Sequence, residues 1–362
     1  MKVTGIDVRR YGEPSGGDFE IIVVEVESDA GHRGMGYQLL FGSFGRLVAQ
    51  LIIEQLAPSI LNEDPWHTND LWERMNAAIP RRSADGFVRG SIAAIDVALW
   101  DLKAKEMNAP VSKLLGGSRE RVRTYANCAH NLPPDQLGAK ALEYVQAGHR
   151  ALKVRGTSLA LNDVAARIEA VRDAVGPDVR LMVDVNGTWD VDTAIQQLKR
   201  WERFDVYWLE EPVAPSDIAG YARIRERAGN TYIVGGEQHV GLSEFRALID
   251  NRAVDIVQPN VAITGGVTDW LRIHSYATAL GIPVSPWNMQ AIHIHMATAL
   301  PNVQWVEYFM PDNPLLALKA KLFSGPVIEE EVRPDGVYLK PPAMPGFGLS
   351  LDPETAAACR LG

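Results

Sequence analysis

The chain has 362 residues, of which 46% are hydrophobic and 22% charged, and its formal net charge is −9 at pH 7. This composition is typical of a globular protein, and the length suits a barrel of about 250 residues with an accessory domain. The negative charge and the lack of a basic run argue against nucleic-acid binding, and no apolar run approaches the roughly 20 residues of a membrane span. Two cysteines and the lack of a signal-peptide pattern lead us to expect a cytoplasmic protein.

The first third of the chain predicts a small α+β domain. Residues 1–36 alternate between apolar and polar side chains like the strands of a β-meander, with glycine-rich turns between them. Residues 44–61, 65–78 and 86–107 show the apolar periodicity of helices. The stretch "LLGG" at 114–117 then ends this unit.

After about residue 121, short apolar runs alternate with amphipathic helices. This alternation with short loops predicts parallel strands, and the eight strand-like segments predict a closed (β/α)₈ barrel. Seven helices separate these strands, whereas the eighth helix is poorly defined. The tail is rich in proline and glycine and is expected to return to the first domain, which divides the chain into residues 1–120, 121–323 and 324–362. The predicted barrel helices are 134–147, 161–175, 190–203, 216–228, 242–249, 265–280 and 291–299.

Three carboxylates follow three consecutive predicted strands: Asp184 in "MVDVN", Glu210 in "YWLEEP" and Glu237 in "VGGEQH". Functional side chains of such barrels lie at the carboxyl ends of the strands, so these three should converge. Carboxylates that lie close together repel one another and raise one another's pKa. A divalent cation bound between them offsets this repulsion. Ligands that are all oxygen favour Mg²⁺ over zinc, with Mn²⁺ also possible. The sequence therefore predicts a divalent metal site.

Several longer motifs occur in the same order along the whole chain: "SIAAIDVALWDLKAKEMNAPVSKLLGG", "VDVNG", "WLEEP", "GGEQ" and "DIVQPNVAITGGVT". Together they resemble the mandelate racemase / muconate lactonizing branch of the enolase superfamily. The resemblance implies an α/β fold: a modified TIM barrel of the (β/α)₇β type, with an N-terminal α+β capping domain that the C-terminal tail completes. It also implies a homo-oligomer with one Mg²⁺ per subunit, bound by Asp184, Glu210 and Glu237. Such enzymes remove the proton α to a carboxylate while the metal stabilises the enediolate.

Three positions depart from the pattern of this branch. The second-strand motif K-x-K is here Lys153-Val154-Arg155, and arginine stays protonated at ordinary pH. Arg155 is therefore interpreted as a carboxylate clamp and Lys153 as the candidate base, its pKa lowered by burial and by the neighbouring cation. Asn260 and Trp287 stand where racemases of the branch have the aspartate and histidine of a second base. Racemization by the usual pair of bases is thus not expected.

Other side chains are candidates for the same site. The resemblance assigns Glu307 of "WVEYF" to a group that hydrogen-bonds the substrate carboxylate. His239 either replaces the lost acid as a catalytic residue or is a structural histidine, and Tyr37 and Tyr125 are further candidates for that role. The residues that we assign to substrate binding are Asn186, Asn260, Trp287 and Tyr37.

Loops of the cap near residues 12–19 and 37–46 would close the barrel mouth in this branch. The apolar residues of the second loop either make part of the pocket apolar, together with Trp287, or pack the cap onto the barrel. His293 and His295 lie two residues apart on a predicted helix, so they face different sides and do not form a metal pair. The apolar residues in question are Leu39, Leu40, Phe41 and Phe44.

These features predict a Mg²⁺-dependent carbon–oxygen lyase that removes the α proton of a hydroxy acid, above all a sugar acid. Loss of the β-hydroxyl as water would then give a 2-keto acid. One alternative is a racemase, epimerase or cycloisomerase of a carboxylate substrate that uses Lys153 with a partner such as His239. Another is a barrel that binds metal and carboxylate without chemistry. In each case the expected partner is a small carboxylate.

Overall fold

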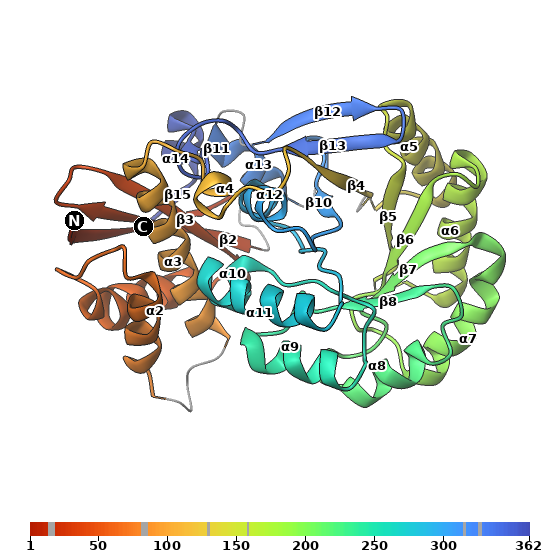
Figure 1. The fold of residues 1–362 in the computed structure, drawn as a ribbon. Helices are drawn as coiled ribbons and strands as arrows, with labels where there is room; N and C mark the ends of the chain where they lie inside the picture. The colour runs from red at the N-terminus through yellow and green to blue at the C-terminus, as the bar shows by residue number, and fades with distance from the viewer. Residues whose placement is uncertain (14–18, 81–85, 129–130, 158, 314–315, 325–327) are drawn as a thin grey trace.

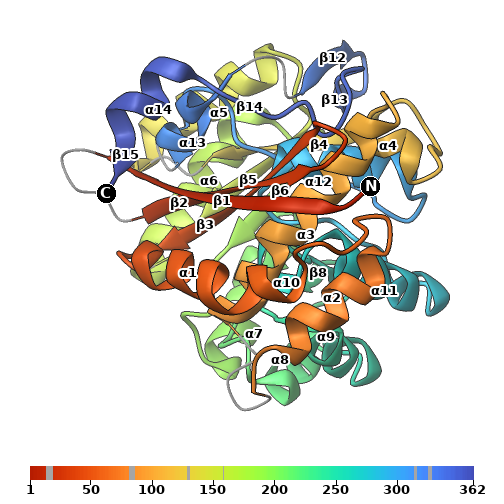
Figure 2. The ribbon, with the colours of Figure 1, turned by 90° about the vertical axis from the view of Figure 1, so that its left-hand side faces the viewer.

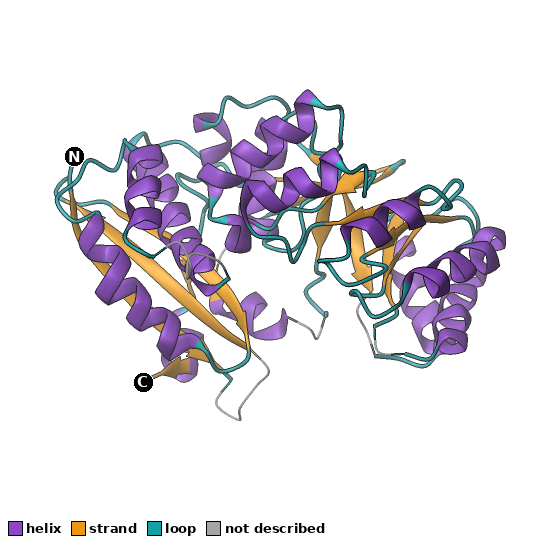
Figure 3. Ribbon diagram, turned by 90° about the horizontal axis from the view of Figure 1, so that it is seen from below, coloured by secondary structure: helices purple, strands orange, loops and turns teal. Residues whose placement is uncertain are grey.

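The computed structural model contains a cap and a barrel that lie side by side (Figure 1). Seen from below, the strands of the cap and of the barrel form two separate groups, each with helices against it (Figure 3). None of the helices in the described part of the chain is long and apolar enough to cross a membrane. The structure describes residues 1–13, 19–80, 86–128, 131–157, 159–313, 316–324 and 328–362.

An antiparallel sheet forms the cap, with strand order β15-β1-β2-β3. Successive side chains of a strand point to opposite faces. Accordingly, Ile22 and Val24 of β2 pack with the cap helices, whereas Ile21 and Val23 join the larger core. The strands are β1 (Val3–Gly12), β2 (Phe19–Ser28), β3 (Arg33–Phe41) and, from the end of the chain, β15 (Arg360–Leu361).

Helix α3 (Phe87–Glu106) lies between this sheet and the barrel (Figure 2). It approaches β3 closely, since a Cβ atom on Gly34 would lie only 2.0 Å from the backbone oxygen of Ala98. On its other side, Asp96 accepts hydrogen bonds from the backbone N of Thr268 at 2.9 Å and from its Oγ1 at 2.6 Å. The other cap helices are α1 (Gly45–Leu51), followed by a π-helical turn and a 3₁₀ turn to Ser59, α2 (Thr68–Ala77) and α4 (Val111–Leu114).

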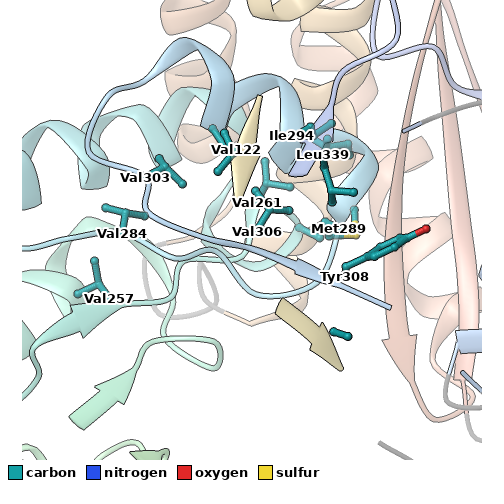
Figure 4. Close-up of a cluster of buried hydrophobic side chains, with 14 of the residues drawn as sticks. Val122, Val257, Val261, Val284, Met289, Ile294, Val303, Val306, Tyr308 and Leu339 are labelled. Atoms are coloured by element: carbon teal, nitrogen blue, oxygen red, sulfur yellow. The ribbon is translucent and has the colours of Figure 1, made fainter. Parts of the chain in front are cut away.

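Parallel strands form the barrel in the predicted order, and β10 pairs with β4 to close it. The seventh predicted strand is reduced to Val284, which bridges Val257 on one side and Val303 on the other. These valines meet in the core between strands and helices (Figure 4). The strands are β4 (Val122–Cys128), β5 (Ala151–Arg155), β6 (Arg180–Asp184), β7 (Val206–Glu210), β8 (Tyr232–Gly235), β9 (Ile256–Val257) and β10 (Val306–Tyr308).

Helices follow each of these strands except the last, as the sequence predicts. The predicted (β/α)₇β barrel with its α+β cap is therefore confirmed. After β10 the chain instead leads through α13 (Ala317–Leu322) towards the cap. The barrel helices are α5 (Pro134–Gln146), α6 (Leu161–Val175), α7 (Val191–Trp201), α8 (Ile218–Arg225), α9 (Gly241–Asp250), the pair α10 (Val261–Thr264) and α11 (Val267–Ala279), and α12 (Gln290–Ala299).

The tail, residues 324–362, which we expect to return to the cap, also pairs with the barrel. Two of its strands, β12 (Glu329–Arg333) and β13 (Gly336–Lys340), form a hairpin, and β13 pairs antiparallel with β4 of the barrel. The physical reason is that the start of β4 offers unpaired backbone groups, which the hairpin satisfies. Only the last part of the tail reaches the cap sheet. The remaining elements are β11 (Phe323–Ser324), β14 (Ser350–Leu351) and α14 (Pro353–Cys359).

A layer of large side chains fills the lower part of the barrel interior. Tyr125 and Trp208 meet edge to face at 5.0 Å between ring centroids. Residues two positions further along a strand point the same way, so the next layer lies directly above this one, at the carboxyl ends. That layer is polar, and it contains the candidate site. The lower layer consists of Tyr125, Ala151, Met182, Trp208, Val234, Ile256 and Trp305.

Candidate active site

The three predicted metal ligands lie together at the carboxyl ends of β6, β7 and β8. Asp184 and Glu210 are the last residues of their strands and are paired in the sheet register, which places them at one height. Glu237 follows β8 after Gly236, whose φ of +129° and close approach to Phe245 favour glycine. All three carboxylates are buried, and each offers an oxygen within 4.8 Å of the others.

The protonation of these carboxylates reflects their burial. Burial raises the pKa of Glu210 to about 7, although Lys153 opposes the shift. Burial and the nearby Glu211 and Asp184 raise the pKa of Glu237 well above its usual value. The Oε2 atoms of Glu210 and Glu237 are buried without a hydrogen-bond partner. A divalent cation supplies the charge and coordination that these oxygens need, so the residues fit a Mg²⁺ ion.

Lys153 points into the same cluster. Its Nζ lies 2.9 Å from Oε1 of Glu210, 2.8 Å from Oε1 of Glu307 and 3.3 Å from Oδ2 of Asp184. The prediction of a lowered pKa for Lys153 is wrong for this structure. Burial does lower the pKa, but the three carboxylates around the ammonium outweigh burial and raise it well above its usual value.

Glu307 supports the candidate base from β10, which is separated from β5 by β4 in the sheet. Its Oε1 accepts from Nδ2 of Asn127 at 2.7 Å, and its Oε2 accepts from the backbone N of Asn288 at 2.9 Å. With Lys153 as a third partner, the buried carboxylate is held from three sides. Glu307 does not line the main cavity. It contacts Lys153, which does line it.

A cavity of about 260 Å³ opens above the carboxylates and divides into two chemical halves. The polar half comes from β4, β5 and β6 and from the turns after β6, β8 and β9, and it includes the predicted clamp Arg155, whose Nε donates to Oγ1 of Thr157 at 3.1 Å. The other half is apolar and includes Leu39 and Phe41 of the cap. The polar lining residues are Asn127, Lys153, Arg155, Asp184, Asn186, Glu237, Gln238 and Asn260, and the apolar ones are Leu39, Phe41, Ala262, Ile263, Trp287 and Phe309.

The apolar residues of the cap loop divide between the cavity and the interior of the cap, and the alternative that they make part of the pocket apolar holds for two of them. Leu39 and Phe41 line the cavity. Leu40 is buried among the cap helices, and Phe44 packs against Phe87 with ring centroids 5.0 Å apart. The part of the first loop at residues 14–18 lies outside the described residues.

Three of the four residues that we assigned to substrate binding lie at this cavity. Asn186 donates from its backbone N to Oδ1 of Asp184 at 2.9 Å and from Nδ2 to Glu237 at 3.3 Å. Asn260 lines the cavity and also caps α10, because its Oδ1 accepts from the backbone N of Ala262 at 2.8 Å. Trp287 lines the apolar half.

Tyr37 is not brought to this cavity. Its ring packs against Phe323 at 4.5 Å, and it borders a second cavity of about 70 Å³. The side chain is buried, and burial raises the pKa of its hydroxyl. The predicted histidines of α12 are structural: His293 accepts from the backbone N of Val261 at 3.1 Å, and His295 from the backbone N of Ser112 at 3.3 Å.

His239 is not among the residues that line the cavity, which favours the structural alternative for this histidine. The chain turns after β8, where the backbone N of His239 bonds to the oxygen of Gly236 at 3.1 Å. The alternation of a strand therefore no longer holds, and the ring is buried 6.0 Å from that of Phe245. Burial lowers the pKa of His239 to about 4.

We expect the substitution His239→Gln to leave kcat/KM within about threefold of the wild type, because the ring does not face the cavity. The same change should lower the free energy of unfolding by about 1–2 kcal/mol, since it disturbs a buried side chain. Steady-state kinetics and thermal denaturation check the two expectations. A hundredfold loss of kcat/KM with an unchanged melting temperature would show that His239 takes part in catalysis.

Several residues of the site were missed. Asn127 is the second-to-last residue of β4 and could have been found by reading strand ends. Glu211 stands in "LEEP" with a φ of +44°, and burial together with Asp184 raises its pKa to about 8. Gln238 donates to Oε2 of Glu211 at 2.6 Å. Asn288 lies in a bend shortly before α12, with a φ of +54°.

Comparisons with known proteins agree with this geometry. Residues 15–116 match the mandelate racemase / muconate lactonizing enzyme, N-terminal domain family, and residues 136–356 match the enolase C-terminal domain-like family. The chain is 31% identical to an arabinonate dehydratase of Saccharolobus solfataricus, over 92% of this chain and 88% of the relative. It is also 31% identical to a 3,6-anhydro-alpha-L-galactonate cycloisomerase of Streptomyces coelicolor, over 80% of each chain.

A solved structure is similar over nearly the whole length. L-talarate dehydratase from Polaromonas sp. JS666, complexed with Mg and L-glucarate, superposes with a TM-score of 0.88. The two sequences are 32% identical, and the match covers 99% of this chain and 98% of the other.

Proposed function

Because this chain belongs to the mandelate racemase / muconate lactonizing enzyme family of the enolase superfamily, we propose that it is a Mg²⁺-dependent dehydratase of sugar acids. The observation that carries the proposal is the position of Lys153. Its Nζ lies 2.9 Å from one candidate metal ligand and 3.3 Å from another, at the cavity floor. A base and a metal so close can act on adjacent atoms of one substrate. The dehydratase names of relatives support the same reaction.

In this proposal Asp184, Glu210 and Glu237 hold the Mg²⁺ ion. The bound ion supplies the positive charge that stabilises the negative charge developing on the substrate carboxylate as the α proton leaves. Arg155, on the same face of β5 as Lys153, clamps the carboxylate.

Lys153 takes the α proton at Nζ and returns it to the departing β-hydroxyl. The C–H and C–O bonds of the substrate break, water leaves, and the resulting enol rearranges to a 2-keto acid. Lys153 has to be neutral when it receives the proton. Two of the carboxylates that raise its pKa, Asp184 and Glu210, are those whose charge a bound divalent cation offsets.

The opposite wall of the cavity favours a reaction on one face of the substrate. It carries Trp287 and Asn260 where racemases of the branch have their second base, and Asn260 is engaged in capping a helix. Among the described lining residues, the titratable side chains belong to β5, β6 and the turn after β8. A single acid–base group is compatible with syn elimination of water and not with racemization.

A cycloisomerase is the second candidate, and the apolar half of the cavity favours it. Trp287 and Phe309 offer flat apolar surfaces that suit the C–H face of a ring better than an open polyol chain. A relative at 31% identity is a cycloisomerase of an anhydro sugar acid.

A panel of sugar acids, their lactones and their anhydro derivatives distinguishes these functions. We expect 2-keto acid from at least one member, with turnover lost in EDTA and restored by Mg²⁺ or Mn²⁺. Omission of the protein is the control for spontaneous elimination. A product of unchanged mass that has opened or closed a ring, in place of a product lighter by one water, would identify a cycloisomerase.

The assembly and location belong to the proposal as well. We propose a homo-oligomer in the cytoplasm whose partner is a small carboxylate. Light scattering of the purified protein tests the oligomeric state.

A further inference from the structure

Lys319 is a buried lysine outside the barrel. It lies on α13, the helix that follows the last barrel strand, and only 7% of it is exposed. Its Nζ lies 2.5 Å from Oδ1 of Asn288 and 5.6 Å from the centre of the Phe309 ring. In the described part of the chain this ammonium forms no ion pair, and burial lowers its pKa to about 7 against the opposing effect of Glu307.

Packing alone does not explain this lysine. Moving an ammonium out of water is unfavourable, and a methionine of similar length would fill the same space without that penalty. We therefore examine the contact of Lys319 with Asn288 for the role of this lysine.

Asn288 is the link between α13 and the candidate site. It is 1% exposed and has a φ of +54°, in the left-handed region that asparagine tolerates. Its side-chain oxygen accepts from Lys319 and from the backbone N of Met289 at 2.6 Å. Its own backbone N donates to Oε2 of Glu307 at 2.9 Å. The orientation of the Asn288 side chain thus helps to fix the backbone N–H group from which Glu307 accepts a hydrogen bond.

The chain of hydrogen bonds continues from Glu307 to Nζ of Lys153 at 2.8 Å. We propose that Lys319 is a positioning residue that holds Asn288, and through it Glu307, so that Lys153 is directed at the substrate. The catalytic meaning of this role rests on the proposed function, whereas the positioning of Glu307 does not.

The location of α13 gives the contact a second consequence. Phe323 directly follows the helix, and its ring contacts Tyr37 of the cap strand β3 at 4.5 Å. The contact between Lys319 and Asn288 therefore connects α13, the helix next to this cap contact, with the interior of the barrel.

Two variants of similar length test the proposal. Lys319→Met removes the donor, whereas Lys319→Gln keeps a donor that can reach Asn288. We expect kcat to fall about 30-fold or more in the methionine variant with KM little changed, because a displacement of about 1 Å at a base can lower the rate by that order. The glutamine variant should retain most of kcat. Lys321→Met is the control, since Lys321 is exposed on the same helix.

A double-mutant cycle shows whether Lys319 acts through Glu307. In a Glu307→Gln background, Lys319→Met should lower kcat by less than about threefold further, because the two residues act in one chain. Additive losses would contradict the proposal.

Crystal structures of Lys319→Met and Lys321→Met supply a measurement that needs no activity. The distance between the Asn288 nitrogen and Oε2 of Glu307, 2.9 Å here, should lengthen in the first variant only. An unchanged distance overturns the positioning role. If the wild type converts no acid, the proposed function fails while this comparison still decides the role of Lys319. If the methionine variant does not fold, Lys319→Leu, which also lacks a donor, supplies the same comparison.

Discussion

The substitution Glu210→Gln is expected to abolish Mg²⁺ binding and turnover together. Glu210 lies beside Asp184 in the sheet register and is fully buried, and its Oε2 has no other partner. A neutral amide removes one of the three negative charges that attract the cation and offers one oxygen in place of two. We expect the affinity for Mg²⁺ to fall by more than about a hundredfold, since even partners of metal ligands change it by tenfold to a hundredfold.

Isothermal titration with MgCl₂ and steady-state kinetics measure the two losses. Glu202→Gln is a matched control, because Glu202 is exposed and is not among the residues that line the cavity. If Glu210→Gln bound Mg²⁺ as tightly as the control, the carboxylate cluster would not be the metal site.

The substitution Lys153→Met is expected to act in opposite directions on turnover and on metal binding. Turnover should fall by at least about a thousandfold, within the range that a positioned base contributes. Binding of Mg²⁺ should become tighter, because the ammonium lies 2.9 Å and 3.3 Å from two candidate ligands and repels a cation there.

The opposite signs separate the loss of a base from the loss of the fold. Titration with MgCl₂ and kcat/KM on the same preparation measure both, with Lys199→Met on the exposed face of α7 as the control. Activity within tenfold of the wild type would show that another group removes the proton.

The metal cluster could be predicted because strand ends are visible in the sequence. Asp184 and Glu210 each end an apolar strand, and parallel register fixes their height before any side-chain detail is known. The same reasoning placed Lys153 and Arg155 on one face of β5. It also explains why the barrel and cap were predicted correctly, since both follow from periodicity along each element.

Reasoning from periodicity failed where the chain leaves its strands. His239 comes two residues after Glu237, but a turn intervenes and directs the ring towards Phe245. The direction of the pKa shift of Lys153 depends on carboxylates from three other strands, whose distances a sequence does not contain. Lys319 reaches Asn288 from a helix outside the barrel.

The central claim is Mg²⁺-dependent removal of the α proton from one face of a hydroxy acid, and proton NMR in D₂O tests it most directly. With Mg²⁺ and the best substrate of the panel, the α-proton signal should disappear as a 2-keto acid forms. Recovered substrate should keep its configuration at the α carbon, because the opposite wall of the cavity carries Trp287 and Asn260. Epimerised substrate, or an α-proton signal that persists for every acid of the panel, would contradict the claim.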